Sequence, residues 1–180
     1  QRVIRAASNM AELIDDILEL SRITRMEMSV SSVDLSQCAR QYMERLKAEE
    51  QGRSLETQVE NSITVRGSKE LLRAALENLL DNAWKFTSKK ETASIQFGTT
   101  ARDGETVYFV RDNGVGFDME YADKLFGTFQ RLHPKEAYPG TGIGLATVKR
   151  VIERHTGRVW ADSKVGKGAT FYFTLPEQLS

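Results

Sequence analysis

The first 27 residues carry apolar side chains at alternating steps of three and four, which is the pattern of an amphipathic helix. The seam and the positions that widen it are Val3, Ile4, Ala6, Met10, Leu13, Ile14, Ile17, Leu18, Leu20 and Thr24. A face this wide is typical of a helix in a bundle and is broader than a two-stranded coiled coil needs. Periodicity alone also allows a helix over 1–27 that packs on its own domain.

Residues 28–86 predict short connections, two helices and two strands. In order, the elements are a linker (28–33), a helix (34–51), two strands (54–59 and 63–66) and a helix (69–86). Asp34 is suited to cap the first of these helices, and Gly52 ends it. Leucine and alanine residues spaced three and four apart give the second helix one strongly apolar side.

Residues 93–175 predict more strands than helices. In order, the elements are two strands (93–100 and 106–111), a short helix (120–126), a helix (143–155) and two strands (158–163 and 169–175). Asp103-Gly104 marks a hairpin turn, and Gly157 is placed to end the preceding helix. Hairpins rather than βαβ crossovers join the strands. This predicts an α+β two-layer sandwich, in which a mixed, mostly antiparallel sheet carries helices on one face, plus the long N-terminal helix.

Composition limits the classes of partner. The 180 residues hold 25 basic and 25 acidic side chains, whereas nucleic-acid and membrane-surface binders usually carry a basic excess. No apolar run approaches the roughly 20 residues that cross a bilayer, and no signal peptide precedes the first helix. The single cysteine, Cys38, cannot form an internal disulfide, which fits a reducing compartment, and we assign it to packing. We expect a cytoplasmic domain that binds no nucleic acid and has no direct membrane contact.

Two glycine-rich stretches are candidates for a phosphate-binding site. Their defining positions are Asp112, Gly114, Gly116, Gly140, Gly142 and Gly144. Glycine lets a backbone approach a ligand closely, and the second stretch runs into a helix whose N-terminal N–H groups favour phosphate. Its spacing matches neither a P-loop nor a dinucleotide-binding fingerprint. Each stretch, taken alone, is also compatible with a structural turn.

Asn78, Asn82 and Lys85 form a polar stripe at i, i+4 and i+7 on the helix over 69–86. Leucines flank this stripe, and burying two carboxamides and an ammonium without partners would be costly. A carboxamide oxygen can bind Mg²⁺ and an ammonium can pair with phosphate oxygens, so a metal–triphosphate would satisfy all three groups. A solvated polar face is the alternative.

Five segments together resemble the sequence motifs of sensor histidine kinases. They are the asparagine box (78–87), the first glycine box (112–116), the phenylalanine box (126–131), the second glycine box (140–145) and the closing hairpin (166–176). These segments cover about residues 68–176 in the order and spacing of the family. The resemblance implies the catalytic and ATP-binding domain of the GHKL superfamily, with its Bergerat-type ATP-binding fold.

The helix over 1–27 resembles the second helix of the dimerisation and histidine-phosphotransfer hairpin of the same family. This resemblance favours the bundle interpretation and divides the chain into an incomplete hairpin (1–27), a linker (28–33) and a catalytic domain (34–180). It also implies that the phosphoaccepting histidine lies on the first helix of the hairpin, before residue 1. His133 lies in a loop and His155 at a helix end, and we expect neither to accept phosphate.

The resemblance further implies which residues bind ATP and Mg²⁺. Asp112 would accept a hydrogen bond from the adenine amine, with Thr170 at the same edge of the base, and Asn82 would hold Mg²⁺. The candidate catalytic residues, on the phosphates, are Asn78, Lys85 and Arg131. The other ATP-binding positions are Phe86, Gly114, Gly116, Gly140, Thr141, Gly142, Ile143, Gly144 and Leu145. Phe126 and Phe129 would anchor the lid over the site in apolar surface.

One difference from related ATPases bears on the reaction. In the gyrase and MutL branch of the superfamily, the position of Asn78 holds a glutamate that activates water, and a carboxamide cannot act as a general base. The resemblance therefore implies an autokinase of a homodimer, controlled by an upstream sensor domain, that supplies phosphate to a response regulator receiver domain. The segment 130–140 is similar to kinases attached to phytochrome-type sensors. A degenerate nucleotide-binding module without transfer and a stand-alone ATPase are the alternatives.

Overall fold

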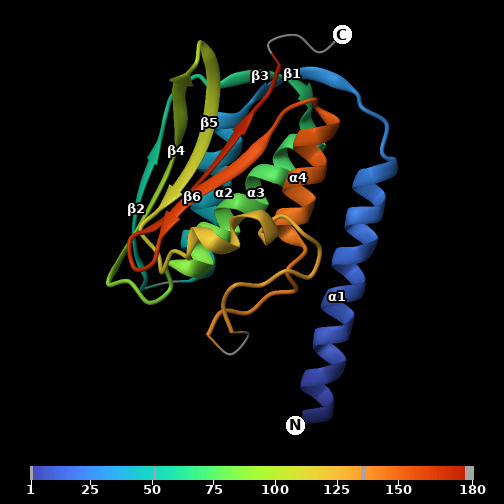
Figure 1. Ribbon diagram of the computed structural model, residues 1–180, viewed down its shortest axis with the longest axis vertical. Helices are drawn as coiled ribbons and strands as arrows, with labels where there is room; N and C mark the ends of the chain where they lie inside the picture. Colours follow the sequence, from blue (N-terminus) through green and yellow to red (C-terminus); the bar gives the residue numbers. More distant parts are fainter. Residues whose placement is uncertain (1, 51, 135–136, 177–180) are drawn as a thin grey trace.

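The computed structural model describes residues 2–50, 52–134 and 137–176, and for residues 2–6 and 9 it describes the backbone only. A five-stranded sheet carries helices on one face, and the N-terminal helix lies beside this body (Figure 1). The elements are α1 (Arg2–Arg25), β1 (Val30–Asp34), α2 (Leu35–Glu49), β2 (Ser54–Val59), β3 (Thr64–Ser68), α3 (Lys69–Phe86), β4 (Thr92–Arg102), β5 (Glu105–Asp112), the 3-10 helix η1 (Met119–Lys124), α4 (Gly144–Arg154), β6 (Val159–Lys164) and β7 (Gly168–Thr174). The predicted α+β sandwich is confirmed.

The main sheet has the strand order β2-β4-β5-β7-β6. Strand β2 pairs with β4 in parallel, whereas the other three pairs are antiparallel. The prediction of a mixed, mostly antiparallel sheet is confirmed, but the expectation that hairpins replace crossovers is wrong. A parallel pair needs a long crossover connection, and residues 60–91, which include β3 and α3, supply it.

A separate two-stranded sheet joins β1 to β3. The sequence analysis expects a linker over 28–33, but residues 30–34 are a strand, with Val33 buried. The strand forms because β3 offers a partner, and it connects α1 to the main body through backbone hydrogen bonds. Asp34 caps α2 as predicted, since its Oδ1 accepts a hydrogen bond from the Gln37 N–H at 2.8 Å.

Helix α3 lies at the centre of the core and positions the candidate site. Its apolar side is buried, with each side chain at most 3% exposed: Leu71, Leu72, Ala75, Leu76, Leu79 and Leu80. This side packs in one cluster with Ile95, Phe97 and Phe171 of the sheet. Helix α4 packs beside α3, so the polar stripe of α3 lies next to the start of α4. None of the described helices combines the length and hydropathy of a membrane span.

The end of α4 differs from the expected glycine cap. Thr156 takes the left-handed backbone conformation (φ 57°), while Gly157 permits close packing, because an added Cβ would come 2.0 Å from the Thr174 carbonyl oxygen. His155 is fully buried; its Nε2 accepts the Ser68 N–H at 3.0 Å and its Nδ1 lies 2.8 Å from the Val151 carbonyl oxygen. Burial lowers the pKa of His155, so the imidazole is neutral and structural.

Candidate functional site

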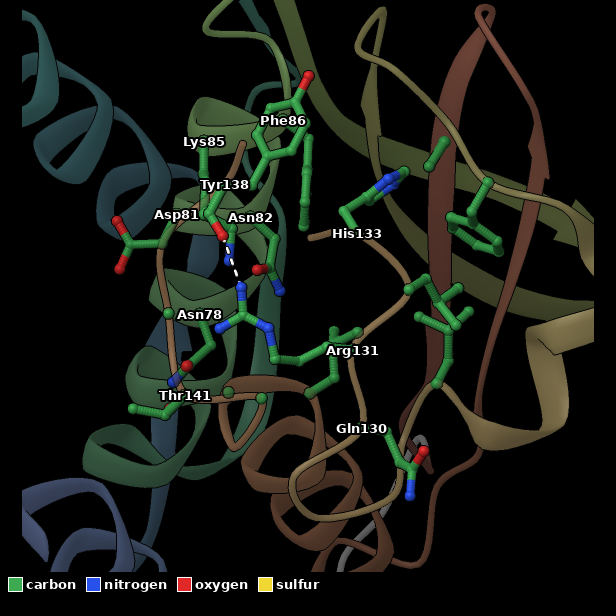
Figure 2. Close-up of a pocket in the computed structure, with 18 of the residues that line it drawn as sticks. Asn78, Asp81, Asn82, Lys85, Phe86, Gln130, Arg131, His133, Tyr138 and Thr141 are labelled. Atoms are coloured by element: carbon green, nitrogen blue, oxygen red, sulfur yellow. Dashed lines mark hydrogen bonds between the residues drawn. The ribbon is translucent and has the colours of Figure 1, made fainter. Parts of the chain in front are cut away.

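A cavity of about 260 Å³ lies between α1, α3, the turn after β5 and the segment that connects η1 to α4. We call the described residues of this segment, 125–134 and 137–143, the lid segment. Most of the predicted site residues line the cavity, namely Asn78, Asn82, Lys85, Phe86, Asp112, Gly116, Arg131, Gly140, Thr141, Gly142, Gly144 and Leu145. Figure 2 shows the stripe on α3 on one side of this space and Arg131 of the lid segment opposite it. Gly114, Ile143 and Thr170 are not among the lining residues.

The polar stripe of α3 presents amide groups to the cavity. The Nδ2 of Asn78 donates to the Ala74 carbonyl oxygen at 2.9 Å, and a Cβ added to Gly144 would lie 2.6 Å from Asn78 Oδ1. Glycine at 144 therefore lets the start of α4 approach this amide. The side chain of Asn82 forms no hydrogen bond with any residue that the structure describes. Its carboxamide is thus available to a ligand or metal ion.

Asp112 lies at the other end of the cavity and is 6% exposed. Its Oδ1 accepts hydrogen bonds from the backbone N–H groups of Gly114 at 2.7 Å and Ala169 at 3.3 Å. Burial raises the pKa of the Asp112 carboxyl to about 6, although these two hydrogen bonds act in the opposite direction. Within the described residues no hydrogen bond reaches Oδ2, which leaves one acceptor for a ligand.

The first glycine stretch holds Asp112 against its neighbours. A Cβ at Gly114 would lie 2.6 Å from the Phe86 carbonyl oxygen, so Gly114 packs behind the site against the end of α3. Gly116 has φ 62°, and a Cβ there would lie 2.2 Å from the Lys164 carbonyl oxygen. Gly114 therefore shapes the turn, whereas Gly116 also borders the cavity.

Two cationic side chains, Lys85 of the stripe and Arg131 of the lid segment, line the same part of the cavity. Burial lowers the pKa of Lys85, and the nearby charge of Arg131 lowers it further, while Asp81 and Glu12 act in the opposite direction. The Arg131 Nη2 donates to the Tyr138 carbonyl oxygen at 2.7 Å, drawn as the dashed line in Figure 2. Two cations that approach each other in a partly buried site favour an anionic ligand between them.

An aromatic cluster closes the cavity over Phe86. The ring of Phe86 lies 5.2 Å from that of His133 and 5.1 Å from that of Tyr138, centroid to centroid, and His133 and Tyr138 are 5.4 Å apart. Tyr138 is 5% exposed, and burial lowers the pKa of His133. The sequence analysis does not assign these two residues to the site, although both fall in the loop between two motifs that it names.

The two phenylalanines expected to anchor the lid behave differently. Phe126 packs edge-on against Phe171 of the sheet, with ring centroids 6.4 Å apart. Phe129 is 54% exposed and has a left-handed backbone (φ 63°). The expectation is therefore wrong for Phe129, because the turn that brings its N–H to the Gly142 carbonyl oxygen at 3.0 Å directs its side chain to solvent.

Thr170 and Ile143 are not at the cavity, for different reasons. Side chains alternate along β7, so Ala169 and Phe171 line the cavity while Thr170 points to the other face of the sheet. There its Oγ1 accepts a hydrogen bond from Arg111 Nε at 3.2 Å. Ile143 is 1% exposed and belongs to the apolar interior. Ala169, whose backbone N–H helps to orient Asp112, was not predicted from the sequence.

Helix α1 contributes two carboxylates that the sequence analysis did not assign to the site. Glu12 and Asp16 line the cavity, and Asp16 Oδ2 accepts a hydrogen bond from the Thr141 hydroxyl. The signal in the sequence was limited to two acidic residues four apart. The contact of Asp16 with Thr141, 125 residues further along, arises only when the chain folds.

Comparison with known proteins decides the family. A family model described as "Histidine kinase-, DNA gyrase B-, and HSP90-like ATPase" matches residues 67–179. The chain belongs to this family. A solved structure of full-length ShkA in complex with AMPPNP has a TM-score of 0.74 with it and 28% sequence identity, over 97% of this chain and 37% of that chain. The resemblance to histidine kinases, first seen in the sequence motifs, is confirmed.

Curated relatives agree with this assignment. The chain is 37% identical over 175 residues to cyanobacterial phytochrome A of Nostoc sp. strain PCC 7120. It is 35% identical over 172 residues to the methanogenesis regulatory histidine kinase FilI of Methanothrix harundinacea strain 6Ac. These matches cover 96% and 95% of this chain but 22% and 19% of the relatives. The chain thus spans about a fifth of their length.

Proposed function

We propose that this chain binds Mg-ATP and donates the γ-phosphoryl group to a histidine on a partner hairpin, which passes it to the receiver domain of a response regulator. One observation carries the proposal: the acceptor of Asp112 and the amide-and-ammonium stripe of α3 line one cavity. The separation of a base acceptor from a cationic, amide-rich end matches the chemistry of a nucleoside triphosphate. The name of the relative FilI, a histidine kinase, supports the same conclusion, as does the AMPPNP bound in the similar structure of ShkA.

The base end selects adenine through hydrogen-bond direction. Asp112 Oδ2 accepts a hydrogen bond from the exocyclic amine of adenine, whereas guanine presents a carbonyl oxygen at that position. Two acceptors that face each other in a buried site cost about 1–3 kcal/mol. Phe86 borders the same space, and its ring becomes available to the base when Tyr138 moves away.

The phosphate end combines charge with backbone donors. Lys85 and Arg131 neutralise phosphate oxygens, and Asn78 donates through the second N–H of its amide. The backbone N–H groups of Gly142 and Gly144 lie at the N-terminal end of α4, where the helix dipole also favours an anion. The cavity of about 260 Å³ lies just below the roughly 300–1,000 Å³ usual for ligand sites.

The metal-binding role belongs to Asn82. Its carboxamide is unengaged by the described residues and borders the phosphate end, so it fits an oxygen-preferring cation. Mg²⁺ held there would offset the negative charge of the phosphates. No other residue needs to be invoked as a ligand, since Mg²⁺ on a nucleotide usually keeps water and phosphate oxygens in its shell.

The transfer step needs little acid–base chemistry from this chain. A neutral imidazole nitrogen of the partner attacks the γ-phosphorus, a P–N bond forms, and the bond to the β–γ bridging oxygen breaks as ADP leaves. Arg131 stabilises the charge on the transferred group. Asn78 cannot deprotonate water, so ATP hydrolysis remains slow relative to transfer.

The exposed apolar side chains of helix α1 bear on the partners of the protein. Four of its large apolar side chains are exposed by 44–62%: Met10, Ile14, Ile17 and Leu18. Such a face is suited to a helical bundle, which supports a homodimer formed through the N-terminal hairpin of a longer protein. An upstream sensor domain would act through the same hairpin.

A reconstitution experiment tests the proposal. The chain is mixed with a separate histidine-bearing hairpin of a histidine kinase, Mg²⁺ and γ-labelled ATP, and Asp112→Asn serves as the control. Acid-labile label on the hairpin, absent with the variant, is the expected result. Binding of Mg-ATP without transfer would instead favour a regulatory module, and the absence of any binding heat would contradict the proposal.

A further inference from the structure

Helix α1 is docked on the body that carries the cavity. Figure 1 shows it running beside α4, and hydrogen bonds fix its C-terminal part there. The Arg154 guanidinium donates to the carbonyl oxygens of Ile23 and Met26, at the end of α1, and Ile23 is 3% exposed. The middle of α1 is thereby held over the cavity, with Glu12 and Asp16 among its lining residues.

Both carboxylates line the cavity together with Thr141 and Lys85, which are assigned above to the ATP site. Asp16 accepts the hydroxyl hydrogen of Thr141, which lies in the second glycine stretch. Glu12 is close enough to Lys85 for its charge to favour the protonated ammonium. The spacing of four residues places the two carboxylates on one side of α1. In this arrangement α1 supplies the negative charge that the cationic end of the cavity otherwise takes from a ligand.

We propose that Glu12 and Asp16 act as built-in competitors for the phosphates of the nucleotide, so that docking of α1 and binding of ATP oppose each other. The inference rests on the proposed function, because it uses the same cavity. It adds a regulation of that site by the helix that resembles the second helix of the phosphotransfer hairpin.

The competition has two physical sources. The Thr141 hydroxyl has one hydrogen to donate, so it cannot serve Asp16 and a phosphate oxygen together. A triphosphate placed near two carboxylates in a partly enclosed site also experiences repulsion that water screens only in part. Adenosine brings no phosphates and leaves both contacts in place. By linkage, ATP weakens the docking of α1 by the same factor by which docking weakens ATP binding.

Charge-removing substitutions test the idea by calorimetry. Asp16→Asn and Glu12→Gln are compared with Asp15→Asn, a control that removes the same charge from an exposed residue outside the cavity lining. We expect the Glu12→Gln/Asp16→Asn double variant to bind Mg-ATP about five- to tenfold more tightly, at the lower end of usual couplings between sites. Adenosine affinity, and the affinity of Asp15→Asn for Mg-ATP, should equal those of the wild type.

Amide hydrogen exchange gives an independent readout on the unaltered chain. Saturating Mg-ATP should speed exchange in residues 10–20 of α1, whereas saturating adenosine should not. Two results would overturn the competition and leave the proposed function intact. One is that the double variant binds Mg-ATP no more tightly than Asp15→Asn does. The other is that Mg-ATP leaves hydrogen exchange in α1 unchanged. Failure of every variant to bind Mg-ATP would overturn both.

Discussion

The two oxygens of the Asp112 carboxylate have different surroundings. Oδ1 accepts the N–H groups of Gly114 and Ala169, and these bonds set the rotation of the group. Oδ2 is the acceptor left for a base. An asparagine would keep its amide oxygen on the two N–H groups, because turning its NH₂ toward them would oppose donors to donors. The NH₂ would then face the cavity.

Asp112→Asn should therefore reverse the base preference. We expect Mg-ATP binding to weaken by about tenfold or more, because the NH₂ of the asparagine and the adenine amine are both hydrogen-bond donors and would face each other. Mg-GTP should gain affinity, since its carbonyl oxygen accepts from the same NH₂. Isothermal titration calorimetry with both nucleotides measures the change, and circular dichroism confirms that the fold persists. An unaltered affinity for Mg-ATP would refute the adenine assignment.

The same side chain should make stability depend on pH. The folded protein raises the pKa of Asp112 from 3.8 to about 6, so folding favours its protonated form. This contribution is complete below about pH 4 and is lost as pH rises through 6, a change on the order of 3 kcal/mol. Urea unfolding at pH 4 to 7 should show the wild type losing stability relative to Asp112→Asn over this range. A difference that does not vary with pH would contradict the raised pKa.

At the scale of elements, helix α3 contributes to both the hydrophobic core and the candidate site. Its C-terminal end, which carries Lys85 and Phe86, is held by Arg53, whose Nη2 donates to the Trp84 carbonyl oxygen at 2.7 Å. The Arg53 guanidinium also lies 3.8 Å from the Trp84 ring centroid. This contact between a loop and a helix end orients the residues at the cavity, and no periodic pattern in the sequence reveals it.

Two glycines with positive φ have different surroundings: Gly142 lies in the lid segment and Gly166 in the turn between β6 and β7. Gly142 has φ 81°, and an added Cβ would lie 2.8 Å from the Gln130 carbonyl oxygen. Gly166 has a similar backbone (φ 78°) with nothing within 4 Å of the added Cβ. An alanine at either position incurs about 1 kcal/mol of backbone strain. Only the Gly142 substitution also displaces the lid segment.

Gly142→Ala should thus weaken Mg-ATP binding by about tenfold, whereas Gly166→Ala should leave it unchanged, because a shift of about 1 Å in a binding loop is costly. Gly166→Ala should lose ~1 kcal/mol in unfolding free energy, and Gly142→Ala should lose more, because its added Cβ also meets the Gln130 carbonyl oxygen. Calorimetry and urea denaturation separate the two effects. Equal affinities for the two variants would show that the glycine at 142 serves the backbone conformation alone.

On the scale of the whole molecule, α1 has a buried C-terminal end and an exposed apolar side. Its buried end packs on α4 through Ile23, whereas Ile14 and Leu18 are exposed. The C-terminal end of α1 therefore fits a helix that packs on its own domain, whereas the exposed side with Ile14 and Leu18 fits a helix in a bundle. The division into 1–27, 28–33 and 34–180 stays a prediction, and β1 within the expected linker is part of the folded body.

The exposed side should drive self-association. We expect Ile14→Ser/Leu18→Ser to lower the association of the chain at high concentration and to change its unfolding free energy by less than about 0.5 kcal/mol, as is usual at exposed sites. Ile23→Ala, at a buried position of the same helix, should instead cost about 2–5 kcal/mol. Sedimentation velocity over a concentration series and urea unfolding measure the two effects. A double variant that associates like the wild type would exclude this face as the interface.

Local patterns anticipated much of the fold and part of the site. The strand over 54–59 and the helix over 69–86 lie where periodicity places them. The polar stripe and the glycine stretches are also visible in the sequence, because each depends on residues only a few positions apart. The alternation of side chains along a strand is local too, but its phase is set by pairing, and for that reason Ala169 rather than Thr170 borders the cavity.

The amino-acid sequence by itself determined the class of the fold, the family and the residue types of a nucleotide site, since these follow from short-range periodicity and from motifs in a fixed order. Tertiary structure alone decided the parallel β2–β4 pair, the contact of Tyr138 with Phe86 and the hydrogen bond between Asp16 and Thr141. Each of these joins segments far apart in the chain. Such contacts form only where the packing of the whole molecule outweighs the entropy of bringing the segments together, which no local pattern records.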